Sequence, residues 1–532
     1  MAHEIHEIET ANSWRSYLPA IAAIVGALLM LGVRLQIGPS FMSDGALMMI
    51  ALACYLLAAL FHLTNIYAPS EMSRKIGLWT ATAGVFFNLS SWLVRWVAAY
   101  DREIAMLRAG GSDETPWIFR YIPFANLYDL SLAFAFGAGI ATLLLARKRN
   151  FQVLAAFSLP LAALILVLAR FIGSEFIDLP PVLDSYWRPI HVGVASLSYG
   201  VALVCFAIAV IYLLKAGTKV EAMAIWSSIF AFSVIATISK FSVLTEFVYR
   251  AGLFVPNSAG GKPFSAPFRL ELPFVGIALT VAAVLLAGVV IAFAIHHFKN
   301  NAGAKTAGHV LLKLAFIAQI VALAVFVSGI RSGGVVEAKL RAQLDVNPAQ
   351  YIVAGRAIAE KQQLTAKEFA ALTPIQLEQM ARQYLQMNGP SMYLSLNTNP
   401  VEFAGLLTGL AGTFFVLLFG FKTEKLRERL PSLESLDNLM YKTACLAFAG
   451  LAMLLITGAI WANESWGRPW GFDSKETGAL VAWLTYAAFL HTRISRGWTG
   501  KSSAYFAILG FLLVIFTYLG VSYLLPGLHS YA

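Results

Sequence analysis

Charged residues and paired cysteines are both scarce in this chain of 532 residues. Only 13% of the residues are charged and 58% are hydrophobic, a balance too apolar for a soluble protein of this length and typical of a bundle of membrane-spanning helices. The three cysteines, Cys54, Cys205 and Cys445, lie within apolar runs and form no CxxC pair. The sequence therefore contains neither a thioredoxin-like redox centre nor a CxxCH motif of its own.

Glycine patterns that bind phosphate are also missing. No Walker-type or dinucleotide-binding pattern occurs, so transport driven by nucleotide hydrolysis would need another subunit. The net charge of +10 comes largely from basic clusters that flank apolar runs. We interpret it as a signal of membrane topology, with a lipid bilayer as the surroundings, and predict no nucleic-acid binding.

Runs of about twenty apolar residues recur along the chain and predict an all-α, polytopic transmembrane bundle of about thirteen spans. The run at 222–247 is the least regular, because Lys240 and Glu246 interrupt it and ionisable groups are costly at membrane depth. The runs lie near residues 17–37, 45–67, 77–98, 124–145, 152–172, 191–214, 222–247, 271–296, 309–330, 401–421, 438–460, 474–493 and 503–525.

With thirteen spans, the basic clusters all fall on one side of the membrane. The positive-inside rule makes this side cytoplasmic. We therefore expect a multi-pass protein of the bacterial cytoplasmic membrane, with its N-terminus in the cytoplasm and its C-terminus on the outer, periplasmic face. The clusters lie around residues 72–75, 146–149, 215–219, 299–305, 422–429 and 493–496.

The segment 461–477 holds three of the twelve tryptophans of the chain, Trp461, Trp466 and Trp470. A single Trp at the end of a membrane helix is ordinarily an interfacial anchor. Three indoles spaced by Gly, Asn and Pro, in a segment too irregular for another helix, instead favour a flat apolar shelf on which a planar cofactor buries large area. The predicted topology puts this shelf on the outer face.

Histidines accompany this segment at both sides. His491 opens the triplet His-Thr-Arg, His529 lies in the closing residues Gly527-Leu-His529-Ser-Tyr-Ala, and Asp184-Ser-Tyr-Trp187-Arg-Pro-Ile-His191 opens an apolar run. With these motifs the sequence resembles the CcsA/ResC membrane subunit of the system II cytochrome c synthase, a family of haem-handling proteins with a tryptophan-rich WWD loop. The resemblance covers about 45–214 and 436–532, and includes the weaker signatures Asn126-Leu-Tyr-Asp129 and Leu197-Ser-Tyr199.

The resemblance implies a subunit of a cytochrome c synthase (haem lyase) that binds haem b and presents it at the outer face for thioether attachment to apocytochrome c. No residue is identified as a catalyst. The residues expected to present the haem are Trp461, Trp466, Trp470 and Asp473, and Phe472 is expected to bind it together with the three tryptophans. The implied partners are a CcsB/ResB-like membrane subunit, an apocytochrome c with a CxxCH motif, and thiol-reducing proteins. Lys475 and Glu476 at the edge of the loop are expected to orient it. Arg468 is a candidate partner for a haem propionate. The alternative for all three is a solvated side chain without a specific role.

Three histidines are candidate ligands of haem iron. Two imidazoles on opposite faces of a haem keep it six-coordinate, and His191 and His529 are expected to do so on the outer side; an interfacial histidine and a solvated tail residue are the alternatives. The resemblance implies that His491, at the inner end of its helix, is a ligand for haem that crosses the membrane. The second histidine ligand would come from the CcsB/ResB-like protein or, alternatively, be His62. His296 and His297 are adjacent, so they cannot share one face of a helix and indicate a helix terminus.

The tryptophan-rich segment departs from the family pattern W-x-W-D-P-K-E-T-W. This chain has Trp470-Gly-Phe472-Asp473-Ser474-Lys475-Glu476-Thr477-Gly478, so Phe472 has no N–H donor and Gly478 supplies no ring. Thioether formation thus stays open while haem binding is expected. Two alternative functions remain: a haem transporter or chaperone without ligase activity, and a structural b-haem subunit of a respiratory complex.

The chain organisation follows from the same pattern. The chain is expected to begin with a tail and an extra span at 1–44. The family-like regions are 45–214 and 436–532, and an insertion of about four spans lies between them at 215–435. Its polar part, 331–400, predicts a small α-helical subdomain on the outer face, with capping signals at Thr365-Ala-Lys-Glu368 and Thr373-Pro-Ile-Gln376 and a stop at Gly389. A docking platform for the acceptor and a spacer or subunit contact are equally compatible with it.

Overall fold

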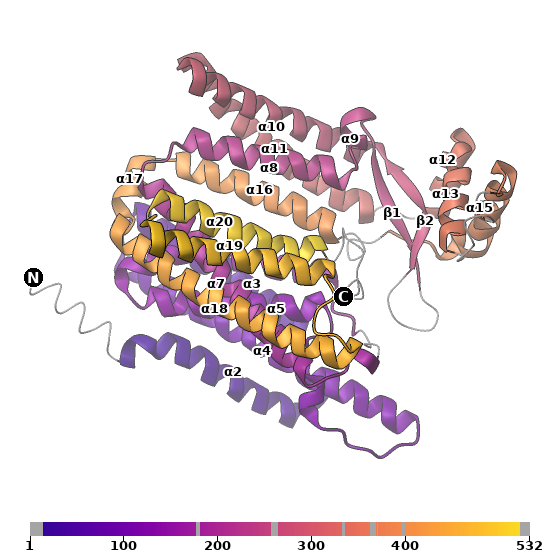
Figure 1. Cartoon of the computed structure of the whole chain (residues 1–532), viewed down its shortest axis with the longest axis horizontal. Coiled ribbons are helices and arrows are strands. Elements are labelled where there is room, and N and C mark those ends of the chain that lie inside the picture. The colour runs from indigo at the N-terminus through magenta and orange to yellow at the C-terminus, as the bar shows by residue number, and fades with distance from the viewer. Residues whose placement is uncertain are drawn as a thin grey trace, which may run out of the picture. The chain divides into compact units, whose positions relative to one another are not determined.

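The computed structural model describes residues 14–176, 181–256, 264–331, 336–361, 369, 371–394 and 400–521. These residues are almost entirely helical and form two compact units (Figure 1). The first unit combines Met1–Lys219 with Lys422–Ala532, and the second is Val220–Phe421. The predicted polytopic helical bundle is thereby confirmed.

Within the described residues, eleven helices are long and apolar enough to cross a membrane. Every one of them coincides with a predicted apolar run. The predicted spans at 77–98 and 474–493 also form helices, but their composition is more polar than that of the eleven. The difference from thirteen therefore concerns polarity and not helix formation.

The first unit is built around α7, which packs against α18, α5 and α20. A second layer consists of α3 against α4 and α6. The chain passes from α20 directly into a single π-helical turn, Phe516–Gly520. The helices of this unit are α2 (Leu18–Ile37), α3 (Asp44–Tyr67), α4 (Glu71–Ala109), α5 (Leu127–Ala146), α6 (Ala155–Ile172), α7 (Trp187–Lys215), α17 (Thr423–Arg429), α18 (Leu433–Trp466), α19 (Ser474–Arg496) and α20 (Lys501–Ile515).

Helix α4 is polar because its buried face carries a hydrogen-bonding ladder. The Asn88 amide donates to the Leu132 carbonyl at 2.8 Å, and the Ser91 hydroxyl donates to the Asp44 carbonyl at 2.8 Å. Polar groups inside a membrane bundle are stable when other helices satisfy them. The polarity of α4 therefore indicates an interior helix of the unit.

A buried ion pair joins α4 to the start of α5. Arg95 is 1% exposed, and its Nε lies 3.0 Å from Asp129 Oδ1. The guanidinium also donates to the carbonyls of Ser174 and Glu175 and lies 3.7 Å from the ring centroid of Phe176. Because Asp129 is in the first turn of α5, this pair positions the residues just before α5.

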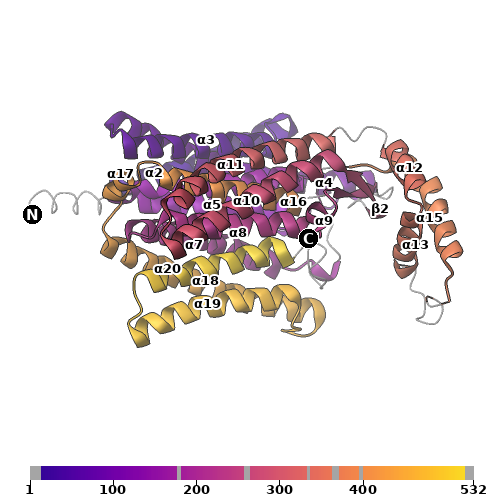
Figure 2. The same cartoon turned by 90° about the horizontal axis from the view of Figure 1, so that it is seen from above.

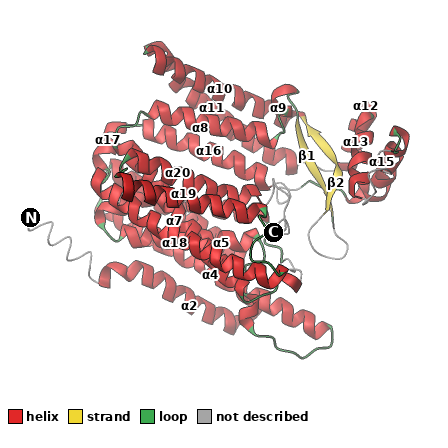
Figure 3. Ribbon diagram, in the orientation of Figure 1, coloured by secondary structure: helices red, strands yellow, loops and turns green. Residues whose placement is uncertain are grey.

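The second unit contains four of the spans and one two-stranded sheet (Figure 3). Its elements are α8 (Val220–Ile238), α9 (Ser242–Thr245), β1 (Tyr249–Val255), β2 (Phe264–Leu272), α10 (Pro273–Lys299), α11 (Ala302–Arg331), α12 (Val336–Val346), α13 (Ala349–Lys361), α15 (Pro374–Asn388) and α16 (Pro400–Gly420). The strands are antiparallel, with Tyr249 opposite Leu272. This hairpin was not among the elements predicted from the sequence.

The predicted span at 222–247 is shorter than expected. Helix α8 ends at Ile238, and Lys240 and Phe241 take the left-handed conformation with φ of 47° and 66°. Consecutive left-handed residues cannot continue a right-handed helix. Lys240 and Glu246 thus lie beyond the helix end.

The polar segment of the second unit folds onto the hairpin. Inward side chains of β1 and β2, such as Leu253 and Phe268, share one apolar core with Leu340 of α12, Ala354 of α13 and Leu385 of α15. The predicted capping box at Thr373 is confirmed, with Pro374 in the first helical turn and an end at Gly389. The second predicted box, at Thr365, lies outside the described residues.

Candidate functional site

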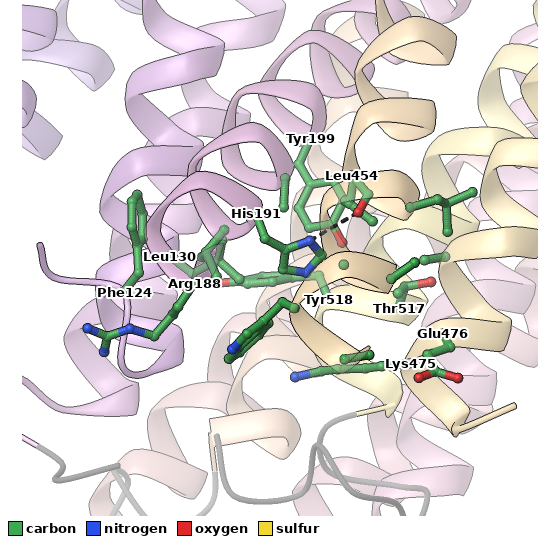
Figure 4. A pocket seen from close by; sticks show the side chains of 18 of the residues that line it. Phe124, Leu130, Arg188, His191, Tyr199, Leu454, Lys475, Glu476, Thr517 and Tyr518 are labelled. Carbon is green, nitrogen blue, oxygen red and sulfur yellow. Dashed lines mark hydrogen bonds between the residues drawn. The ribbon is translucent and has the colours of Figure 1, made fainter. Parts of the chain in front are cut away.

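A pocket in the first unit lies between α7, α18, α19 and the residues that begin α5 (Figure 4). Most of its wall is aliphatic or aromatic, and a few polar groups point into it. The aromatic lining residues are Phe124, Tyr199, Trp461, Trp466, Trp470 and Tyr518; the ionisable ones are Arg188, His191, Lys475 and Glu476. An apolar concavity with a few polar groups is the usual form of a cofactor site.

His191 lies in the second turn of α7 and is fixed by α18. Its Nδ1 is 3.0 Å from the Leu454 carbonyl oxygen and 3.4 Å from the Thr457 hydroxyl. A carbonyl only accepts hydrogen bonds, so Nδ1 donates in this contact, and in the neutral imidazole Nε2 then carries the lone pair. This is the arrangement that histidine ligands of metals ordinarily have.

Gly458 makes the approach of His191 to α18 possible. A Cβ atom at this position would lie 2.8 Å from His191 Cε1, closer than side-chain atoms pack. One helical turn further, Trp461 faces the imidazole with a centroid distance of 5.7 Å. Trp461 is 6% exposed, and its Nε1 has no hydrogen-bond partner among the described residues.

The tryptophan-rich segment is only partly a loop. The expectation of a wholly irregular segment is wrong, because α18 continues through Trp461 to Trp466 and ends where Gly467 takes a φ of 69°. The irregular part is 467–473. Trp466 and Trp470 line the pocket from the helix end and from this loop respectively. The indoles thus come from two local structures.

Phe472 and Asp473 do not line the pocket. Phe472 is 77% exposed and meets Trp470 edge-on at 6.0 Å. Asp473 is the N-cap of α19 and forms a capping box with Glu476, whose carboxylate also accepts from the Gly471 N–H at 2.8 Å. The predicted role of Glu476 in orienting the loop therefore matches its contacts, whereas Asp473 acts on the helix start.

Two tyrosines also line the pocket: Tyr199, which belongs to the signature Leu197-Ser-Tyr199, and Tyr518, which was not among the residues predicted from the sequence. Tyr518, in the π-helical turn, forms a hydrogen bond with Ser131 of α5 and packs edge-on against Phe134 at 5.5 Å. Tyr199 lies 5.8 Å from the same Phe134 ring. Single π-turns inside helices are frequent at functional sites, but the sequence carries no composition signal for one.

The outer rim joins α7 to two neighbouring segments. Arg188 is 8% exposed and donates to the Arg120 carbonyl at 2.9 Å, and Ser185 donates to Glu464 at 2.8 Å. The side chain of Arg120 pairs with Asp184, which raises the pKa of Arg120. These contacts hold the start of α7 against the end of α18, next to His191.

Gly478 is where α19 meets the π-helical turn. A Cβ atom there would lie 2.9 Å from the Thr517 hydroxyl oxygen and 3.4 Å from Val521. The missing ring at this position is therefore a packing requirement of this chain. Thr517, which would meet a side chain at position 478, and Tyr518 line the pocket next to this contact.

The remaining candidate ligands are elsewhere. His491 is exposed near the far end of α19, 3.4 Å from the Ser495 hydroxyl. His62 is 2% exposed on α3 and packs against Gly77 of α4, and α3 and α19 lie at opposite edges of the first unit (Figure 2). The structure therefore does not bring His62 and His491 together. His529 lies outside the described residues.

Comparison with known proteins identifies relatives of this chain. The cytochrome c biogenesis protein CcsA of Pyropia yezoensis is 54% identical over 103 residues, 19% of this chain and 32% of that protein. CcsA of Guillardia theta is 54% identical over 99 residues, 19% of this chain and 33% of that protein. CcsA of Prochlorococcus marinus (strain MIT 9515) is 45% identical over 137 residues, 25% of this chain and 43% of that protein.

The similarity to these relatives is local, since it covers between about a third and under half of their length. The match to the family described as cytochrome C assembly protein is far more extensive. It covers residues 124–254 and 276–529, well over half of the chain and all of the described pocket-lining residues. The chain belongs to the cytochrome c assembly protein family.

Proposed function

We propose that this protein acts in cytochrome c biogenesis by binding haem as a substrate in the pocket beside His191. The observation that carries the proposal is the pairing of His191 with Trp461 in an apolar wall, with Nδ1 anchored to a backbone carbonyl. The carbonyl contact leaves the lone pair of Nε2 as the metal-binding electron pair. Indole and aliphatic side chains suit the face of a porphyrin.

The chemistry of the other lining residues fits haem as well. Haem carries two carboxylates, and Arg188 and Lys475 are the two cationic side chains of the pocket wall. Arg188 is largely buried, where a charge-assisted hydrogen bond to a carboxylate is strong. We assign these two residues to the propionates in place of Arg468, which covers Gly471 in the loop. The second axial ligand is proposed to be His529.

The proposed reaction is thioether formation with an apocytochrome CxxCH segment. In each addition a cysteine S–H adds across a haem vinyl double bond: the S–H bond and the π bond of the vinyl group break, one S–C bond and one C–H bond form, and no group leaves. The protein has to orient the vinyl edge and keep water from the iron, which lowers the barrier without a strong acid or base. Trp466 and Trp470, at the outer end of the pocket, are suited to hold that edge.

The proposed orientation puts the pocket on the outer face of the bacterial cytoplasmic membrane. Arg147, Lys148 and Arg149 follow α5, and Lys215 ends α7, so the ends remote from the pocket are the basic ones. The positive-inside rule then assigns those ends to the cytoplasm. A CcsB/ResB-like subunit and thiol-reducing proteins remain proposed partners, with His491 as the proposed contact to haem in transit.

The absorbance spectrum of the purified protein tests the proposal. The full chain is expressed in haem-replete cells, and His191→Ala is compared with His297→Ala, an exposed histidine at the end of α10. We expect the haem Soret band in the wild type and in His297→Ala, its loss in His191→Ala, and its return with added imidazole. A colourless wild type would sink the proposal.

Haem transport without ligation is the second candidate function. The observation that favours it is the absence of a ring at Gly478 together with the outward exposure of Phe472. Co-expression with an apocytochrome separates the two functions. Haem that resists acid extraction from the acceptor supports ligation, and haem that is fully extractable supports transport.

A further inference from the structure

A second pocket of the first unit lies at the opposite, basic ends of the helices. Its cavity of about 440 Å³ is lined from the end of α3, the start of α4, the turn before α6 and the end of α17. None of the residues that line the pocket beside His191 also lines this second pocket. The lining residues that carry charge are Arg74, Arg149, Arg429 and Glu71.

The charge of this pocket is positive. Glu71 accepts from Arg74 Nη2 at 2.6 Å and also pairs with Arg149. One carboxylate thus holds two guanidinium groups at the pocket wall. Arg429 forms no ion pair with any residue that the structure describes. Three arginines and one glutamate leave a formal charge of +2 around the cavity.

The position of Arg429 is determined by neighbouring backbone contacts. Helix α17 is tied to α3 by a hydrogen bond of 2.7 Å from Lys425 Nζ to the Tyr67 carbonyl. Arg427 fixes the other side of the helix by donating to the Leu214 carbonyl at 2.9 Å. The short helix therefore brings Arg429 to the pocket although it follows α4 by more than three hundred residues of sequence.

One further feature favours an anionic ligand. Helix α4 starts at the pocket with Ser70 as its N-cap, so the positive end of a 39-residue helix faces this region. His62, also in the lining, is 2% exposed, and its imidazole packs against Gly77 of α4. The arginines of the lining therefore supply the donors for an anion.

We propose that this pocket binds a phosphate-bearing anion. Guanidinium groups bind phosphate through paired, charge-assisted hydrogen bonds, and basic pockets between membrane helices on the cytoplasmic side are suited to lipid headgroups. The phosphate can belong to an anionic phospholipid or to a soluble phosphoester. The proposal does not depend on haem binding, because it uses none of the residues around His191.

Native mass spectrometry of the full chain in detergent tests the proposal. Phosphatidylglycerol and phosphatidylcholine with the same acyl chains are offered in turn, and the bound fraction is compared. We expect preferential retention of phosphatidylglycerol, weakened about fivefold in Arg429→Gln, since one basic residue near a membrane surface contributes about 1 kcal/mol. Arg149→Gln should act in the same direction.

The control is Lys148→Gln, which removes the same charge from the neighbouring position but does not line the pocket. It should leave retention unchanged. Titration of delipidated protein with inorganic phosphate distinguishes a soluble phosphoester from a lipid headgroup as the ligand. Phosphate binding that is weakened in Arg429→Gln would indicate a soluble phosphoester. Retention of phosphatidylglycerol without phosphate binding would indicate a lipid headgroup. Equal retention of both lipids without phosphate binding, or equal losses in Lys148→Gln and Arg429→Gln, would overturn the proposal.

Discussion

The imidazole of His191 occupies space that a side chain at Gly458 would fill. A Cβ atom on Gly458 would lie 2.8 Å from Cε1 and 3.1 Å from Nδ1 of His191. The same imidazole is hydrogen bonded to Leu454, one turn before Gly458 on α18. The glycine and the carbonyl together fix the ring at a single depth in the pocket.

Substitution of Gly458 by alanine is therefore expected to weaken haem binding. The added methyl group displaces His191 from the Leu454 carbonyl, and loss of such a supporting contact typically costs about 10- to 100-fold in metal affinity. The Soret absorbance per mole of purified protein measures the effect. Gly32→Ala is the control, because nothing lies within 4 Å of a Cβ atom at that position in α2. Equal haem content in both variants would contradict the proposed role of Gly458.

The sequence predicted the helices well and the site in part. Apolar runs of membrane-spanning length specify helices almost by themselves, because the bilayer leaves few alternatives for the backbone. Local composition explains the main error in the site: Gly, Asn and Pro in the segment after Trp461 predicted a loop, but the helix continues to Trp466. The local residues favour irregular structure there, and the packing of α18 on α7 overrides them.

Other features depend on contacts that no local pattern encodes. The hairpin of β1 and β2 forms because the apolar faces of α12, α13 and α15 cover it, and those helices follow it by many residues. Gly458 and Tyr518 lie in ordinary apolar runs. Their importance follows from what lies opposite them, His191 and Ser131, and only the tertiary structure supplies that.

Restoring the family aromatic at position 478 is expected to destabilise this protein. In Gly478→Trp the side chain must enter space held by Thr517 and Val521, and overpacking of this kind costs about 1–3 kcal/mol or more. Chemical unfolding in detergent measures the loss. Phe472→Trp is the matched control, since Phe472 is 77% exposed and surface changes usually stay within about 0.5 kcal/mol. A Gly478→Trp variant as stable as Phe472→Trp would show that α19 can move away from the π-helical turn.

The buried pair between Arg95 and Asp129 is expected to be a large contributor to the stability of the first unit. Arg95→Gln leaves the Asp129 carboxylate buried without its cation, which typically costs about 3–5 kcal/mol. Arg382→Gln, which breaks the exposed pair with Glu378, should change unfolding little. Both are measured by unfolding of the full chain. Similar small effects in the two variants would mean that water reaches Asp129.

Thr373→Ala tests whether the capping box stabilises α15 locally. The Thr373 hydroxyl accepts from the Gln376 N–H at 3.3 Å, and the Gln376 side chain accepts from the Thr373 N–H at 2.8 Å. Loss of an N-cap costs about 1 kcal/mol, so amide exchange in α15 should accelerate about fivefold. Ser432→Ala, at the N-cap of α18, should leave α15 unchanged. Faster exchange throughout α12 and α13 as well would instead show that the helices and the hairpin open as one unit, as their common core suggests.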